Sequence, residues 1–133
     1  MITETALLGT QRVSDADVYA FISHTLNDIG ISAHLKGYNF LRVCVNLKRV
    51  NPNYKSKEMF RIAAEKFGTN ENNVNSGIHH ALKTAWESGK IGNLNSRFGV
   101  DYFRQGKQMS NFKFISVLAD LISVYYAEQT KSV

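Results

Sequence analysis

The chain of 133 residues has very little of several features on which other protein classes depend. It has one cysteine, Cys44, which excludes an internal disulfide and a cysteine-clustered zinc site. We interpret Cys44 as a small buried hydrophobic residue in a reducing compartment. No segment approaches the ~20 apolar residues of a membrane helix, and the N-terminus lacks the basic-then-apolar order of a signal peptide. The sequence therefore predicts a cytoplasmic protein that does not contact membranes.

The motifs of common enzymes are also absent. The sequence has no Gly-rich phosphate loop, no Ser/His/Asp set at a recognisable spacing and no carboxylate pair flanked as in an active site. His79 and His80 are adjacent, so on a helix they point ~100° apart and cannot bind a metal as an i, i+4 pair does. We expect no enzyme activity, no cofactor and no metal.

What is present is enough apolar side chain for one domain, together with an uneven charge. Hydrophobic residues make up 44% of the chain, so we expect a single domain over residues 1–133 with its core at about 14–127. The net charge of +5 is concentrated: residues 1–33 carry −3, whereas residues 34–107 carry +8. A polyanionic partner would contact the middle of the chain. A merely solvated basic surface is the alternative, and charge alone does not separate the two.

Apolar residues recur at helical spacing, and no useful alternating strand pattern interrupts them. The fold class expected is all-α, a compact bundle of about five to six helices. Ser14 is the expected first cap, and the only proline, Pro52, ends the second helix. Residues 1–12 and 128–133 are expected to be loose ends. The expected helices are Ser14 to Gly30, roughly Tyr38 to Val50, Ser56 to Phe67, a longer helix capped by either Thr69 or Asn70 that ends near Gly89 and has Trp86 in the core, a short turn near Asn95 to Phe98, and a last helix from near Asn111 that buries Phe112, Ile115, Leu118, Ala119 and Ile122.

The segment from about Ser56 to Gly89 predicts a helix-turn-helix. Ala64 allows two helices to approach, Gly68 permits a positive φ at a turn of about three residues, and Val74 with Phe67 is expected to pack inside the angle. The outward face of the second helix, 71–89, carries hydrogen-bonding side chains that suit base edges in the major groove of double-stranded DNA. The expected base-reading residues are Asn72, Asn73, Ser76, His79 and His80.

Other polar residues around this motif are candidates for contacts with DNA phosphates. Together they would make binding salt-dependent, although each alone could be merely solvated. The expected phosphate contacts are Lys36, Lys57, Thr69, Asn70, Lys83, Lys90 and Arg97, with Arg61, Lys66, Arg104 and Lys107 as further candidates.

Three segments carry a family resemblance. Residues 30–42, GISAHLKGYNFLR, are similar to the opening signature of the C-terminal effector domain of the master response regulator of sporulation, the stage-zero sporulation transcription factor. Residues 80–89 resemble the end of that family's recognition helix, and residues 114–120 resemble its final helix. The resemblance spans about 26–122. It implies a six-helix transcription-regulating domain that inserts its recognition helix into the major groove of a promoter box and pairs with a second copy on tandem boxes.

The chain departs from this family in two ways. The family's receiver domain, with its phosphorylated aspartate, would precede this region, whereas only about 25 residues do here; if Met1 is the natural start, we expect no control by phosphorylation in cis. The family's recognition helix resembles a basic reader with arginines at positions aligned with Asn73, Ser76 and His79, and only His80 of the basic readers is kept. Because an arginine–guanine pair gives ~1–3 kcal/mol of discrimination, the preferred DNA sequence is expected to differ or the specificity to be substantially weaker.

Two further functions remain open at this stage. The chain could be a protein-interaction module that pairs with and antagonises a related regulator, or a DNA-binding maintenance protein of a mobile element. An apolar stripe on the last helix would also suit a homodimer. The residues of this stripe are Val117, Leu121, Val124 and Tyr125.

Overall fold

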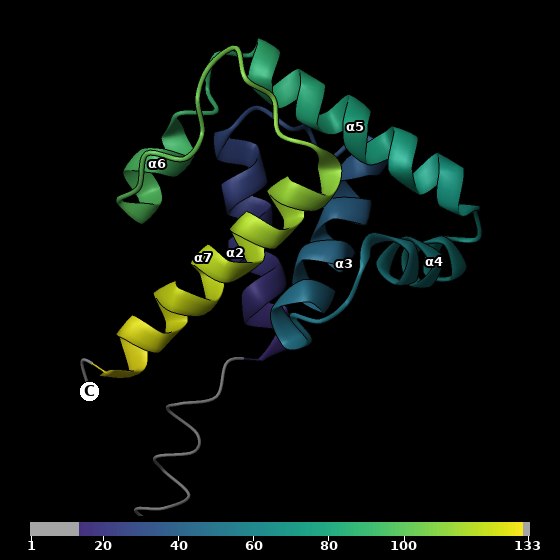
Figure 1. Ribbon diagram of the computed structural model, residues 1–133, viewed down its shortest axis with the longest axis horizontal. Coiled ribbons are helices and arrows are strands. Elements are labelled where there is room, and N and C mark those ends of the chain that lie inside the picture. The colour runs from purple at the N-terminus through teal and green to yellow at the C-terminus, as the bar shows by residue number, and fades with distance from the viewer. Residues whose placement is uncertain (1–13, 132–133) are drawn as a thin grey trace, which may run out of the picture.

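A computed structural model describes residues 14–131, and within this range the chain forms six α-helices and no β-strand (Figure 1). This confirms the predicted all-α bundle of about five to six helices. No helix in residues 14–131 is long and apolar enough to cross a membrane. The helices are α2 Asp15–Asp28, α3 Lys36–Val50, α4 Ser56–Phe67, α5 Glu71–Glu87, α6 Asn93–Phe98 and α7 Asn111–Lys131.

Helix α3 is the centre of the bundle, because α2, α4, α5 and α7 all pack against it. Its side chains Leu41, Cys44 and Val45 are fully buried. Figure 1 shows α7 crossing in front of α3 while α5 lies across its upper end. Burial raises the pKa of the Cys44 thiol to about 12. Cys44 is thus a buried core residue, as the sequence predicted.

The helix boundaries follow local signals closely. Ser14 caps α2 by accepting a hydrogen bond from the Asp17 N–H at 3.1 Å, and Gly30 beyond its end has φ 87°. Asn51, just before Pro52, ends α3. Helix α3 begins two residues earlier than predicted, at Lys36. Gly37 does not fit an apolar helical pattern, and its place inside the helix depends on a contact with α5 described below.

Two predictions about the last helix are wrong. Phe112 is 38% exposed rather than buried, because it lies in the first turn of α7, where its ring packs under the Lys48 ammonium, 4.8 Å from Nζ to the ring centroid. Residues 128–131 are not loose, since α7 continues to Lys131. No glycine or proline follows Asn111, so nothing in the sequence breaks the helix where the apolar pattern fades. Residues 1–12 and 132–133, also predicted to be loose, lie outside the described residues.

Candidate nucleic-acid interface

The turn between α4 and α5 has the geometry that the sequence predicted. Gly68 has φ 65°, and the next N–H, that of Thr69, bonds to the Ala64 carbonyl at 2.9 Å. Asn70 then caps α5 by accepting the Asn73 N–H at 2.8 Å. The turn thus spans the three residues 68–70 and places the two helices at a sharp angle (Figure 1).

The inner angle of the motif is filled differently from expectation. Val74 is fully buried and Ala64 nearly so, as predicted. Phe67, by contrast, is 40% exposed, and its ring packs edge-on against Phe40 of α3 at 5.6 Å between centroids. Phe67 stands at the last residue of α4, where its side chain reaches the adjoining helix α3.

A close backbone approach seats α5 on α3. A Cβ atom placed on Gly37 would lie 2.2 Å from the carbonyl oxygen of Gly77 and 2.7 Å from the Cβ of Ala81. The ring of Phe40, also on α3, packs against Gly77, since a Cβ atom placed on Gly77 would lie 2.9 Å from this ring. Two glycines therefore allow α5 to lie directly on the backbone of α3.

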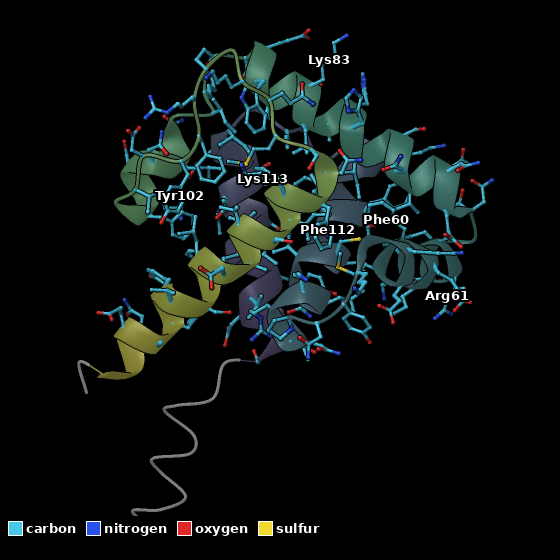
Figure 2. All side chains as sticks on the ribbon, in the orientation of Figure 1. Phe60, Arg61, Lys83, Tyr102, Phe112 and Lys113 are labelled. Carbon is cyan, nitrogen blue, oxygen red and sulfur yellow. The ribbon has the colours of Figure 1, made fainter. Side chains whose placement is uncertain are left out.

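Helix α5 separates its faces completely. Its inner side chains are buried in the core and its outer ones are exposed. The helix runs along the upper edge of the molecule (Figure 1), where Lys83 points away from the protein (Figure 2). Between Asn72 and Lys83 the helix has no acidic residue. The buried residues are Val74, Ile78, Ala81, Leu82, Ala85 and Trp86, and the exposed residues are Asn72, Asn73, Asn75, Ser76, His79, His80, Lys83 and Glu87.

A hollow of about 330 Å³ flanks the start of α5 on the α3 side. It brings together Lys36, Thr69 and Asn73, three of the residues predicted to contact DNA, with Asn39 and Phe67 also in its lining. The Asn73 side chain donates from Nδ2 to Thr69 Oγ1 at 2.9 Å, so it is held at the turn. This arrangement places one amine, one hydroxyl and two amides around a single opening beside α5.

A second hollow, of about 410 Å³, flanks the middle of α5 on the other side. Figure 2 shows Phe60 of α4 and Phe112 of α7 at this place. Asn111, at the start of α7, donates from Nδ2 to both the carbonyl and the side-chain oxygen of Asn75, at 2.9 and 2.7 Å. The sequence reasoning missed this link because 36 residues separate the two asparagines. The hollow is lined by Ser56, Phe60, Asn75, His79, Ser110, Asn111 and Phe112.

The remaining predicted phosphate contacts are more scattered. Lys57 is exposed in the first turn of α4, and Lys90 is exposed just after α5. Arg97 lies on α6, which packs against α2, and it forms an ion pair with Asp28 there. The structure therefore does not bring Arg97 to the hollow beside the start of α5 in which Lys36 and Thr69 lie.

The C-terminal end of α5 is fixed to the irregular segment before α7. Trp86 is buried, as predicted, and its Nε1 donates to the Arg104 carbonyl at 3.0 Å. Asn95 of α6 accepts the N–H groups of Tyr102 and Phe103 on one oxygen, each at 3.0 Å. These bonds give the segment between Gly99 and Asn111 a defined path.

Much of the apolar stripe predicted on α7 is used within the chain. Leu121 is buried, Val117 packs partly against the core, and the ring of Tyr125 stacks on Phe21 of α2 at 4.8 Å between centroids. Val124 is 51% exposed. Within residues 14–131 the helix thus leaves a narrow apolar strip, centred on Val124, on its outer side.

The sequence profile of one known family, described as "Sporulation initiation factor Spo0A C terminal", matches residues 22–122 of the chain. The match runs from the middle of α2 to the middle of α7 and includes both helices of the helix-turn-helix, the close approach of α5 to α3 and both hollows. It agrees with the resemblance seen in residues 30–42, 80–89 and 114–120. The chain belongs to the family of the C-terminal domain of the sporulation initiation factor Spo0A.

Proposed function

We propose that the chain is a sequence-specific DNA-binding regulator of transcription that inserts α5 into the major groove. Its family is one of transcription-factor DNA-binding domains and not of enzymes. The observation that carries the proposal is the outer face of α5, which is exposed, polar and free of carboxylates from Asn72 to Lys83. A helix with its side chains is about 10–12 Å wide, which fits the ~12 Å major groove.

In this arrangement different residues have different roles. Asn72, Ser76 and His80 lie on the outer face and would contact base edges, and asparagine suits adenine because it can bond both N6 and N7. The hollow at Lys36 and Thr69 lies beside the start of α5, where one phosphate backbone would pass. Lys57, in the first turn of α4, would contact the backbone on the other side, as the first helix of such motifs does. Base contacts would set the sequence preference, and phosphate contacts would set the register.

Selection of binding sites from random duplexes tests the proposal. The wild-type protein should enrich a defined sequence. Asn72→Ala and His80→Ala should each weaken binding by ~1–3 kcal/mol at one or two base positions and relax the preference there. Lys57→Ala should instead weaken binding to all duplexes and reduce the salt dependence by about one phosphate.

Asp120→Asn is a suitable control because Asp120 is exposed on α7, away from α5. It should leave both the enriched sequence and the affinity unchanged. If the wild-type protein showed no sequence preference above its non-specific binding, the proposal would be wrong.

A further inference from the structure

Arg42 of α3 differs from the other arginines of the described range in having no anionic partner. Residues 14–131 contain five arginines, and the other four each have a carboxylate oxygen within 4.0 Å. Arg42 is half-buried and forms no such pair. The paired residues are Arg49 with Asp15, Arg61 with Glu65, Arg97 with Asp28, and Arg104 with Asp101.

The surroundings of Arg42 position its guanidinium group without neutralising it. The group lies between the rings of Tyr19 and Tyr38, at 5.2 and 5.6 Å from their centroids. Its Nη1 donates to Asn39 Oδ1 at 3.1 Å, while Nε is buried and has no hydrogen-bond partner among the described residues. Aromatic faces attract a cation, but a partly buried charge is normally paired with an opposite charge.

A hollow of about 280 Å³ opens beside this guanidinium group. It holds two cationic side chains, Arg42 and Lys66, and no carboxylate lines it. Since one water takes up ~30 Å³, the hollow has room for a tetrahedral oxyanion and several waters. The lining residues are Tyr19, Asn39, Arg42, Val43, Lys66 and Phe67.

This hollow continues toward the recognition helix. Asn39 and Phe67 line both this hollow and the one that contains Lys36 and Thr69. A cationic groove thus runs along one side of α3, from Arg42 and Lys66 to the start of α5. Anions bound along it would lie close to the residues that hold α5 in place.

We propose that the hollow beside Arg42 is a binding site for a phosphate-type oxyanion. Arg42 and Lys66 supply the positive charge, and Asn39 holds the guanidinium group in its orientation. The anion is either a phosphate of the DNA backbone or a free inorganic or organic phosphate. Both sources present the same group to the site. The site does not depend on sequence-specific reading by α5, so the two proposals can fail separately.

Titration of the full chain with inorganic phosphate, followed by NMR at the Arg42 Nε–H and the Lys66 side chain, tests the free-phosphate source. Chloride at the same ionic strength is the reference. Phosphate should cause a saturable shift at Arg42, and Lys66→Ala should weaken the binding roughly tenfold, the effect of one charge-assisted hydrogen bond. Arg61→Ala is the matched control, because Arg61 is exposed on the same helix and does not line the hollow.

Titration with duplex DNA tests the other source. If the anion is a DNA phosphate, the duplex should shift the Arg42 Nε–H, and Lys66→Ala should lower the salt slope of DNA binding by about 1 while Arg61→Ala leaves the Arg42 shift intact. If only inorganic phosphate binds, the anion is a free phosphate. Lys66 is exposed, so its alanine variant should fold normally, and circular dichroism would verify this. If neither phosphate nor duplex shifts Arg42 more than chloride does, the proposal is overturned, and Tyr19, Tyr38 and Asn39 hold Arg42 without an anion.

Discussion

Replacing Gly37 with alanine should disturb the packing of α5 on α3. Among the described glycines with a negative φ, this change should have the largest effect. The new Cβ would lie 2.2 Å from the Gly77 carbonyl oxygen and 2.8 Å from its carbonyl carbon. Both atoms belong to the backbone of α5, so no side-chain rotation relieves the overlap. The helices must separate by roughly 1 Å, and overpacking of this kind typically costs ~1–3 kcal/mol.

The gain in helix propensity from glycine to alanine is at most ~1 kcal/mol and acts in the opposite direction. We therefore expect Gly37→Ala to lower the free energy of unfolding by a net ~1–2 kcal/mol. Gly77→Ala should have a smaller effect, because its Cβ would meet the flexible ring of Phe40 at 2.9 Å instead of backbone. Gly92→Ala is the control, since nothing lies within 4 Å of its Cβ and its φ is −63°. It should be neutral or slightly stabilising.

Urea unfolding followed by Trp86 fluorescence measures all three variants, and their DNA affinity gives a second readout. The expected order of unfolding midpoints is Gly92→Ala highest, then Gly77→Ala, then Gly37→Ala. The Gly37 variant should also lose DNA affinity, because α5 is displaced from α3. If Gly37→Ala unfolds at the same urea concentration as Gly92→Ala and binds DNA as the wild type does, the close approach of the two backbones is not what positions α5.

Three further changes have defined outcomes. Asn70→Ala removes the acceptor for the Asn73 N–H and should lower stability in urea by ~1 kcal/mol, whereas Asn70→Asp, which keeps a capping oxygen, should not; equal losses would rule out a capping role. Trp86→Phe leaves the Arg104 carbonyl without its indole donor and should lower the free energy of unfolding by ~1–3 kcal/mol, seen by circular dichroism as a lower thermal midpoint. An unchanged midpoint would mean that the hydrogen bond contributes nothing. Because burial raises the pKa of Cys44 to about 12, the folded protein should keep this thiol protonated at pH 8 and react with a thiol reagent only as fast as the chain unfolds. The free energy of unfolding should fall as the pH rises from 9 toward 12, because only the unfolded thiol ionises in that range. Rapid labelling at pH 8 would contradict burial.

The sequence predicted best where the signals are local. Gly68 marks the turn through backbone freedom, and Thr69 or Asn70 was expected to cap the next helix. Both signals act over a few residues, and the faces of α5 follow from helical periodicity. The start of α3 was misplaced because Gly37 weakens the local helical signal, and only contact with Gly77 forty residues later explains its place. Phe112 was expected in the core because periodicity gives the face of a helix but not where along its length that face leaves the core.

The flanks of the interface depend on contacts between distant segments, and the sequence could not predict them. Asn111 meets Asn75 only because α7 begins beside the middle of α5. The lack of a partner at Arg42 is likewise invisible in the sequence, because it depends on where each carboxylate lies in three dimensions. Charge counting indicated a basic middle segment but not the groove in which Lys36, Arg42 and Lys66 lie.

The division of α5 into a buried and an exposed face has a consequence for how such proteins diversify. Asn72, Ser76, His80 and Lys83 contact solvent and not the core, so exchanging them should change stability by no more than ~0.5 kcal/mol each. Under the proposed function, target preference and folding would be encoded at different positions of one helix. A library randomised at these four positions should consist mostly of folded proteins. Selection from it could give the same scaffold new DNA target sequences without compensating mutations elsewhere.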